Sequence, residues 1–288
     1  MPHPGDSVTL ITILLVVLVV AAGLYFNRRV WRPRQAAAPV PHDGLKVSEM
    51  TAPLATLAVL LLVFVLVQTY GSWAAAGRAE TDEATATLLL FREIDLVGDP
   101  RLRHKLQKEV VCYATSVIHE DWPAMGERRI SNVPTYWGAR LREAGVRLVR
   151  TPNESTAGKQ IIERDGERAS ARQNRLGEAR PTVPDALSWL MLVAVLTVLA
   201  VLSTASSGAA APIIQAGIVL VAAAAFTSTL LLISDLDQPY AGALRRDPTQ
   251  TEFVRDQIAA EVRRPLPCDS SGLPTDAPGF RQATAPLG

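Results

Sequence analysis

Charged residues are scarce in this chain. Only 20% of its 288 residues are Asp, Glu, Lys or Arg, whereas 48% are hydrophobic. A soluble globular domain carries about 25% charged residues, and here several long stretches carry none. The composition therefore excludes an ordinary soluble protein. It predicts an integral membrane protein with a charged domain outside the lipid bilayer.

Cysteine is rare as well. Cys112 and Cys268 are the only two, too few for a disulfide framework and without the spacing of a metal site. This count excludes a secreted protein stapled by several disulfides. The two signs of charge nearly cancel, to a net charge of +1, so no overall field attracts nucleic acid.

Catalytic motifs are missing. The four histidines are scattered, and no pair has the spacing of metal ligands on a helix. The sequence has no phosphate-binding glycine loop, no Gly-x-Ser-x-Gly motif and no local Cys-His arrangement. Asn153 opens a glycosylation sequon, a three-residue pattern that often arises by chance. We therefore predict no enzymatic activity and no catalytic, cofactor or metal site.

The sequence contains four uncharged stretches long enough to cross a hydrocarbon core. Such a crossing takes roughly 20 apolar residues. We predict transmembrane helices over residues 8–26, 52–70, 187–206 and 213–234. The first stretch has a cleaved signal peptide as its alternative, but Met1 to Thr9 lack the positive charge that a signal peptide needs. Small residues at 205–211 predict a tight antiparallel hairpin of the last two spans.

The predicted fold is an all-α polytopic membrane protein with four transmembrane helices and a helical extramembrane domain between the second and third. Residues 27–51 form a basic loop, residues 71–185 the extramembrane domain, and residues 235–288 a C-terminal tail. The tail has one short helix that Asp247 can cap. Beyond Pro265 its Pro, Gly, Ser and Thr content predicts disorder.

Within the extramembrane domain, Asp99 followed by Pro100 predicts the start of an amphipathic helix. We expect this helix to end near Trp122 and Pro123, with the indole packed beneath the stop. Residues 139–180 alternate in charge, which is the usual pattern of a solvated helical face.

Membrane orientation is not decided by the basic residues. Lys and Arg in short loops tend to stay in the cytoplasm. The first loop contains five, namely Arg28, Arg29, Arg32, Arg34 and Lys46, and the opposite face contains six close to span ends, namely Arg78, Arg172, Arg175, Arg180, Arg245 and Arg246.

Four groups of residues, in order along the chain, carry a resemblance to a known family. They are Phe64–Tyr70 with Trp73, Ala76, Glu83, Ala84 and Arg92; Tyr113 with Asp121–Met125; Arg172–Leu176 with Pro184 and Trp189; and Leu236–Gly242, which includes Asp237, Pro239 and Gly242. The set resembles the bestrophin-like domain family of mostly prokaryotic membrane proteins. The sequence departs from the family pattern at Asp121, Gln238 and Tyr240, where the family has Glu, Arg and Phe.

The resemblance implies kinship with bestrophins, which are pentameric anion channels with a cytosolic domain between the second and third spans. It therefore implies a homo-oligomeric channel that passes small anions. Abundant Ala and the preference for Arg over Lys suggest a high-GC prokaryotic genome. We expect a bacterial plasma membrane protein with the domain on the cytoplasmic side. The alternative is a membrane-anchored interaction or regulatory module without transport activity.

The bestrophin comparison also places pore-lining residues on the second span. Leu61, Phe64, Gln68 and Gly71 are three to four residues apart and share one helical stripe. Apolar rings gate by dewetting, and a polar ring next to them helps to rehydrate an ion. The alternative is that Phe64 contacts lipid or core and that Gln68 bonds a neighbouring helix.

Two further groups carry charge near the ends of the spans. Glu83 can pair with Arg175 or Arg172 as an electrostatic latch, or in an exposed ion pair worth ~0–1 kcal/mol. Asp235 and Asp237 can form a cation site or pair with Arg78 or Arg180. The alternative for Asp237 is a cap-and-turn element with Pro239 and Gly242.

Overall fold

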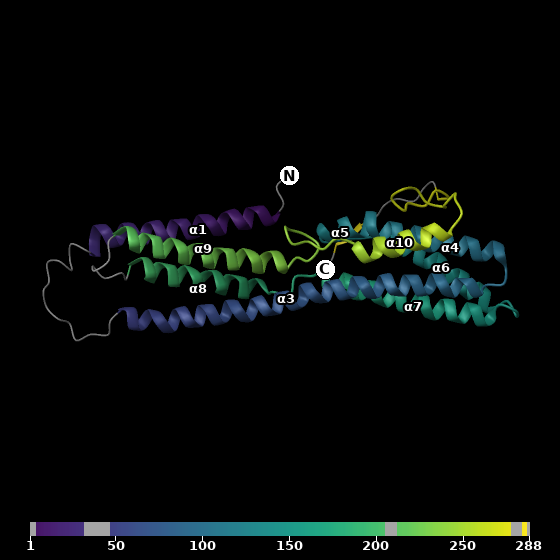
Figure 1. Cartoon of the computed structure of the whole chain (residues 1–288), viewed down its shortest axis with the longest axis horizontal. Helices are drawn as coiled ribbons and strands as arrows, with labels where there is room; N and C mark the ends of the chain where they lie inside the picture. Colours follow the sequence, from purple (N-terminus) through teal and green to yellow (C-terminus); the bar gives the residue numbers. More distant parts are fainter. Residues whose placement is uncertain (1–3, 32–46, 205–211, 278–283, 287–288) are drawn as a thin grey trace. The chain divides into compact units, whose positions relative to one another are not determined.

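The computed structural model describes residues 4–31, 47–204, 212–277 and 284–286 (Figure 1). The chain divides into two compact units. Unit 1 comprises Met1–Gly71 and Thr182–Asp237, and unit 2 comprises Ser72–Pro181 and Gln238–Gly288.

Unit 1 contains the apolar helices. They are α1 (Pro4–Phe26) with the π-helical turn η1 (Asn27–Trp31), the first part of α3 (Val47–Glu93), α8 (Asp185–Thr204) and α9 (Pro212–Leu236). Among the described residues, four helices are long and apolar enough to cross a membrane. The four apolar stretches recognised in the sequence fall on these helices. The hairpin loop expected at 205–211 and most of the basic loop lie outside the described residues.

The interior of unit 1 is formed by aliphatic side chains from all four of these helices. Val16 and Val20 of α1 pack with Leu62 and Val65 of α3, together with residues of α8 and α9. Small residues allow α1 and α8 to approach closely, because any side chain at Gly23 would collide with Ser203.

Unit 2 is built from the remainder of α3 and a set of shorter helices. In chain order these are η2 (Ile94–Leu96), α4 (Pro100–Ser116), the π-helical η3 (Val117–Asp121), α5 (Trp122–Gly126), α6 (Val133–Val149), α7 (Ser155–Glu178) and α10 (Thr249–Glu261). Two three-residue strands, β1 (Arg129–Ser131) and β2 (Thr284–Pro286), pair antiparallel. The fold is therefore mostly helical, with one minimal sheet that the all-α expectation did not include.

The predicted start of α4 is confirmed. The carboxylate of Asp99 accepts a hydrogen bond from the backbone N–H of Arg101 at 2.9 Å, and Pro100 occupies the first turn. α4 itself ends at Ser116, and the π-helical η3 continues to Asp121, next to the expected stop at Trp122 and Pro123, where the short helix α5 begins. Proline is tolerated in the first turn of a helix, since its missing N–H would have no intrahelical acceptor.

The short tail helix α10 begins two residues after its predicted cap, Asp247, and is capped differently. A carboxylate oxygen of Glu80 on α3 accepts a hydrogen bond from the N–H of Gln250 at 2.9 Å. A carboxylate at a helix N-terminus satisfies a free N–H and meets the positive end of the helix dipole. The cap therefore comes from a residue far away in the sequence, which a local pattern does not reveal.

The tail beyond Pro265, expected to be disordered, has defined contacts at its described residues 266–277 and in β2. Cys268 forms a disulfide with Cys112 of α4. The indole N–H of Trp137 donates to the carbonyl of Gly272 at 2.7 Å, and Arg140 pairs with Asp276 at 2.6 Å. Composition predicted disorder here because these partners lie in α4 and α6, more than 100 residues earlier in the chain.

The segment that follows α9 makes a turn at Gly242, which has a φ of 80°. We expect Gly242→Ala to lower the free energy of unfolding by about 1–2 kcal/mol, the cost of a left-handed backbone for a residue with a Cβ. At Gly166, inside α7, an added Cβ would meet nothing within 4 Å. Gly166→Ala should therefore stabilise the protein by about 0.5–1 kcal/mol. Denaturation of the two purified variants in detergent measures both effects, and equal effects would contradict the prediction.

Candidate functional site

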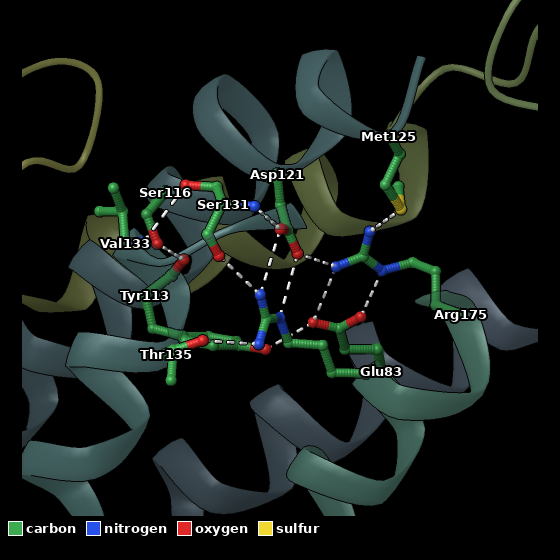
Figure 2. A network of polar contacts seen from close by, with 10 residues as sticks. Glu83, Tyr113, Ser116, Asp121, Met125, Ser131, Val133, Thr135 and Arg175 are labelled. Carbon is green, nitrogen blue, oxygen red and sulfur yellow. Dashed lines mark hydrogen bonds and ion pairs between the residues drawn. The ribbon is translucent and has the colours of Figure 1, made fainter. Parts of the chain in front are cut away.

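A cluster of buried charged side chains occupies the interior of unit 2 (Figure 2). Arg175 of α7 is fully buried and pairs with Glu83 of α3 through its Nε atom. Its Nη2 atom donates to Asp121, at the end of η3, at 2.8 Å. One guanidinium therefore joins two carboxylates from two other elements.

A second arginine, Arg172, lies one turn earlier on α7 and contacts the same aspartate. Its Nε and Nη2 atoms donate to the two carboxylate oxygens of Asp121 at 3.0 and 3.1 Å. Its remaining donors reach the carbonyl of Ser131 at 3.1 Å and the hydroxyl of Thr135 at 3.0 Å. This forked geometry is the strongest form of carboxylate recognition by arginine.

Neutral groups complete the cluster. The hydroxyl of Tyr113 donates to Glu83 at 2.5 Å, and Arg175 donates to the sulfur of Met125 at 3.0 Å. The guanidinium of Arg175 also lies 5.1 Å from the centre of the Trp122 ring, a cation–π distance. The Trp122 ring therefore packs against the charged cluster.

The charges of the cluster balance. Glu83 and Asp121 oppose Arg172 and Arg175, and all four side chains are at most 7% exposed. Burial acts to raise the pKa of Asp121, but the guanidinium groups of Arg175 and Arg172 outweigh it and hold this pKa below its usual value. Burial, reinforced by the charge of Glu83, raises the pKa of Tyr113. The carboxylate of Asp121 is therefore ionised and the phenol of Tyr113 is neutral at physiological pH.

The pairing of Glu83 with Arg175 expected from the sequence is present, whereas the alternative of an exposed ion pair is wrong. The expectation of a solvated face over residues 139–180 is also wrong, because several charged side chains of α7 are buried and paired with charges on the same or other elements. Asp165 and Arg168 of α7 are also buried and paired at 2.6 Å, and Arg168 lies 4.1 Å from the centre of the Tyr113 ring. The sequence does contain a signal, because Asp165, Arg168, Arg172 and Arg175 follow one another at spacings of three, four and three.

The motif at the end of α9 has a structural role in unit 1. One carboxylate oxygen of Asp237 accepts hydrogen bonds from the N–H and hydroxyl of Thr182, at 2.8 and 2.9 Å, and from the N–H of Val183 at 3.0 Å. These contacts favour the cap-and-turn interpretation over a cation site. Pro239 and Gly242 follow in the turn, and the carbonyl of Pro239 accepts from the N–H of Arg246 at 2.7 Å.

Arg92, another residue of the family pattern, forms an exposed pair instead. Its two terminal nitrogens donate to the two oxygens of Glu261 on α10, at 2.6 and 2.7 Å. More than 40% of both side chains is exposed, so solvent screens the attraction and the pair contributes little to stability.

The predicted pore-lining residues lie on the less covered side of α3. Phe64 is 66% exposed, Gln68 and Gly71 are exposed, and Leu61 is half-buried. The buried stripe of the same segment consists of Ala58, Leu62, Val65 and Thr69. Among the described residues, no group of three or more His, Cys, Asp or Glu side chains is placed to hold a metal ion.

The contacts of Asp237 lead to a prediction for unit 1. Asp237→Ala removes the acceptor of three hydrogen bonds and should lower the free energy of unfolding by about 1.5–3 kcal/mol. Asp237→Asn keeps one carbonyl oxygen and should cost less. Thermal unfolding of the two variants in the same detergent orders them, and an alanine variant as stable as the wild type would refute the assignment.

The buried cluster leads to a second prediction. Asp121→Asn leaves Arg172 and Arg175 short of one negative charge in a dry interior, and should cost about 3–5 kcal/mol. The matched control is Glu261→Gln, which breaks the exposed pair with Arg92 and should change stability by at most ~1 kcal/mol. Chemical denaturation of the full-length protein compares them. Equal losses would show that burial of the cluster has no energetic importance.

Comparison with known proteins places this arrangement in a family. A family model, the bestrophin-like domain, matches residues 14–250. Crystal structures of a bacterial bestrophin homologue from Klebsiella pneumoniae have the same fold. One, of a tryptophan-to-alanine variant, has a TM-score of 0.69 at 13% identity and covers 90% of this chain and 98% of its own. Another, phased with zinc, has a TM-score of 0.69 at 13% identity over 88% and 99% of the two chains.

The remaining comparisons agree with this assignment at the level of the fold. A leucine-to-threonine variant of the same homologue has a TM-score of 0.67 at 14% identity, over 88% of this chain and 98% of its own. No curated protein matches the sequence. The family model covers most of the chain, its four apolar helices are those of a membrane protein, and the residues that suggested the resemblance lie within the matched range. This protein therefore belongs to the bestrophin-like family of membrane proteins.

Proposed function

We propose that the protein is a homo-oligomeric channel for small anions in the bacterial plasma membrane, acting as a conduit rather than as an enzyme. Membership of the bestrophin-like family and the fold shared with a bacterial bestrophin homologue support this function. The observation that carries it is the uncovered face of α3, which includes Phe64, Gln68 and Gly71.

This face of α3 is not covered by the described residues of the chain. The buried stripe Ala58, Leu62, Val65 and Thr69 is at most 4% exposed, whereas Phe64 is 66% exposed. A single α3 helix encloses no pore, so a pore along this face requires several copies arranged around an axis. Identical subunits arranged in this way form a closed ring when the rotation from one subunit to the next closes.

The chemistry of the face suits ion passage. A ring of Phe64 side chains gives an apolar constriction that excludes water when narrow, and Gln68, about one turn further along α3, offers amide donors to an anion. Neither residue carries a charge, so selectivity for small anions would come from these N–H dipoles and from pore width.

Removal of the aromatic constriction tests the channel proposal. We expect Phe64→Ala to raise chloride flux from liposomes that contain the purified oligomer, on the order of tenfold if the barrier falls by about 1.4 kcal/mol. The control is Val59→Ala, which removes an exposed side chain about 140° further around α3 and should leave the flux unchanged.

The same experiment separates the two candidate functions. An oligomer that is well folded by gel filtration and passes no chloride would exclude the channel. That result would favour the membrane-anchored interaction or regulatory module instead. Equal fluxes from the Phe64→Ala and wild-type proteins would show that this face does not line the pore.

The channel proposal holds for either orientation in the membrane. The layout of bestrophins predicts a cytoplasmic unit 2, a prediction that comes from the resemblance and not from this chain's own residues.

A further inference from the structure

The disulfide of unit 2 is informative about the compartment in which this unit lies. Cys112 is in α4 and Cys268 in the tail, 156 residues apart, and their Cα atoms are 5.8 Å apart. Both side chains are buried, in a cluster that includes Tyr113, Trp137 and Tyr240. Since the chain has only these two cysteines, each is the other's only possible partner within it.

The surrounding contacts hold the two sulfur atoms together. Gly272, with a φ of 86°, brings the tail so close to α4 that any side chain there would collide with the backbone of Ser116. Trp137 donates to the carbonyl of Gly272, and Asp276 pairs with Arg140. These contacts are made by residues other than the two cysteines, and they hold the tail against α4 beside the disulfide.

A disulfide of this kind is typical of an oxidising compartment. Disulfides persist outside the cytoplasm and are rare within it, where reducing systems keep thiols free. A chain with a single, largely buried disulfide between its only two cysteines therefore fits the extracytoplasmic side of a membrane.

The charge of the loops points the same way, independently of the cysteines. The positive-inside rule counts Lys and Arg in short loops, because long domains are translocated largely regardless of charge. Of the six arginines on the face of unit 2, four lie in the long folded segment 72–181, which leaves Arg245 and Arg246. The short first loop between α1 and α3 keeps all five of its basic residues, and Met1 to Thr9 have none.

We propose that unit 2 lies on the extracytoplasmic side of the membrane, with the first loop in the cytoplasm. There the Cys112–Cys268 disulfide holds the tail segment 265–277 against α4. This orientation is the reverse of the one that the bestrophin layout predicts, and it exposes unit 2 to the external medium. It does not depend on whether the protein conducts anions.

Labelling with a membrane-impermeant maleimide tests the orientation. Arg150→Cys places a thiol at an exposed position of unit 2, and Ala37→Cys places one in the first loop. Both are made in the otherwise natural sequence, so that the disulfide is retained. In intact spheroplasts we expect the Arg150→Cys protein to be labelled, and the Ala37→Cys protein to be labelled only after the membrane is permeabilised.

The state of the natural cysteines is measured in the same cells. After acid quenching and denaturation, the wild-type protein should take up maleimide only if a reductant is added, whereas Cys268→Ala should take up one maleimide without it. The reverse labelling pattern, with Ala37→Cys accessible from outside and Arg150→Cys protected, would overturn the proposal. Free Cys112 and Cys268 thiols in the quenched wild-type protein would also count against it.

Discussion

The buried ion pairs of Glu83 and Asp121 with Arg172 and Arg175 are the interaction on which unit 2 depends. Removing four charges from water costs several kcal/mol for each ion, and only close, hydrogen-bonded pairing compensates for it. Each carboxylate accepts hydrogen bonds from at least one guanidinium. The hydroxyl of Tyr113 donates a further hydrogen bond to Glu83, and the remaining donors of Arg172 bind oxygen atoms of Ser131 and Thr135. Because these residues come from α3, α4, η3, β1, α6 and α7, the cluster specifies how those elements pack together.

The helix α3 connects this cluster to the proposed function. It continues without a break from Val47 to Glu93, so the residues of the uncovered face and Glu83 lie on one continuous helix. The apolar half of the helix buries Leu62 and Val65, and the later half buries Glu80 and Glu83 through polar contacts. The hydrophobic effect stabilises both halves of α3, since Leu90 and Phe91 are buried as well, and the second half adds compensated charge.

How far the sequence predicts this structure depends on whether the signal is local. The apolar helices are recognisable because a span needs an uninterrupted run of hydrophobic residues, and the cap at Asp99 because a cap and its helix are adjacent. The buried stripe of α7 was misjudged because alternating charge normally means a solvated surface, and only partners on other elements reverse that meaning. The cap of α10 by Glu80 and the ordering of the tail were missed for the same reason.

By itself, the sequence determined that the chain is a membrane protein with four apolar helices and an extramembrane region. These properties depend on the hydrophobicity and charge of residues that are neighbours in the chain. It also carried, in an ordered set of motifs, the family to which the chain belongs. Only the tertiary structure decided that Arg172 and Arg175 are buried and that Cys112 meets Cys268. It also decided that Asp237 caps a loop, because these properties depend on atoms brought together from distant parts of the chain.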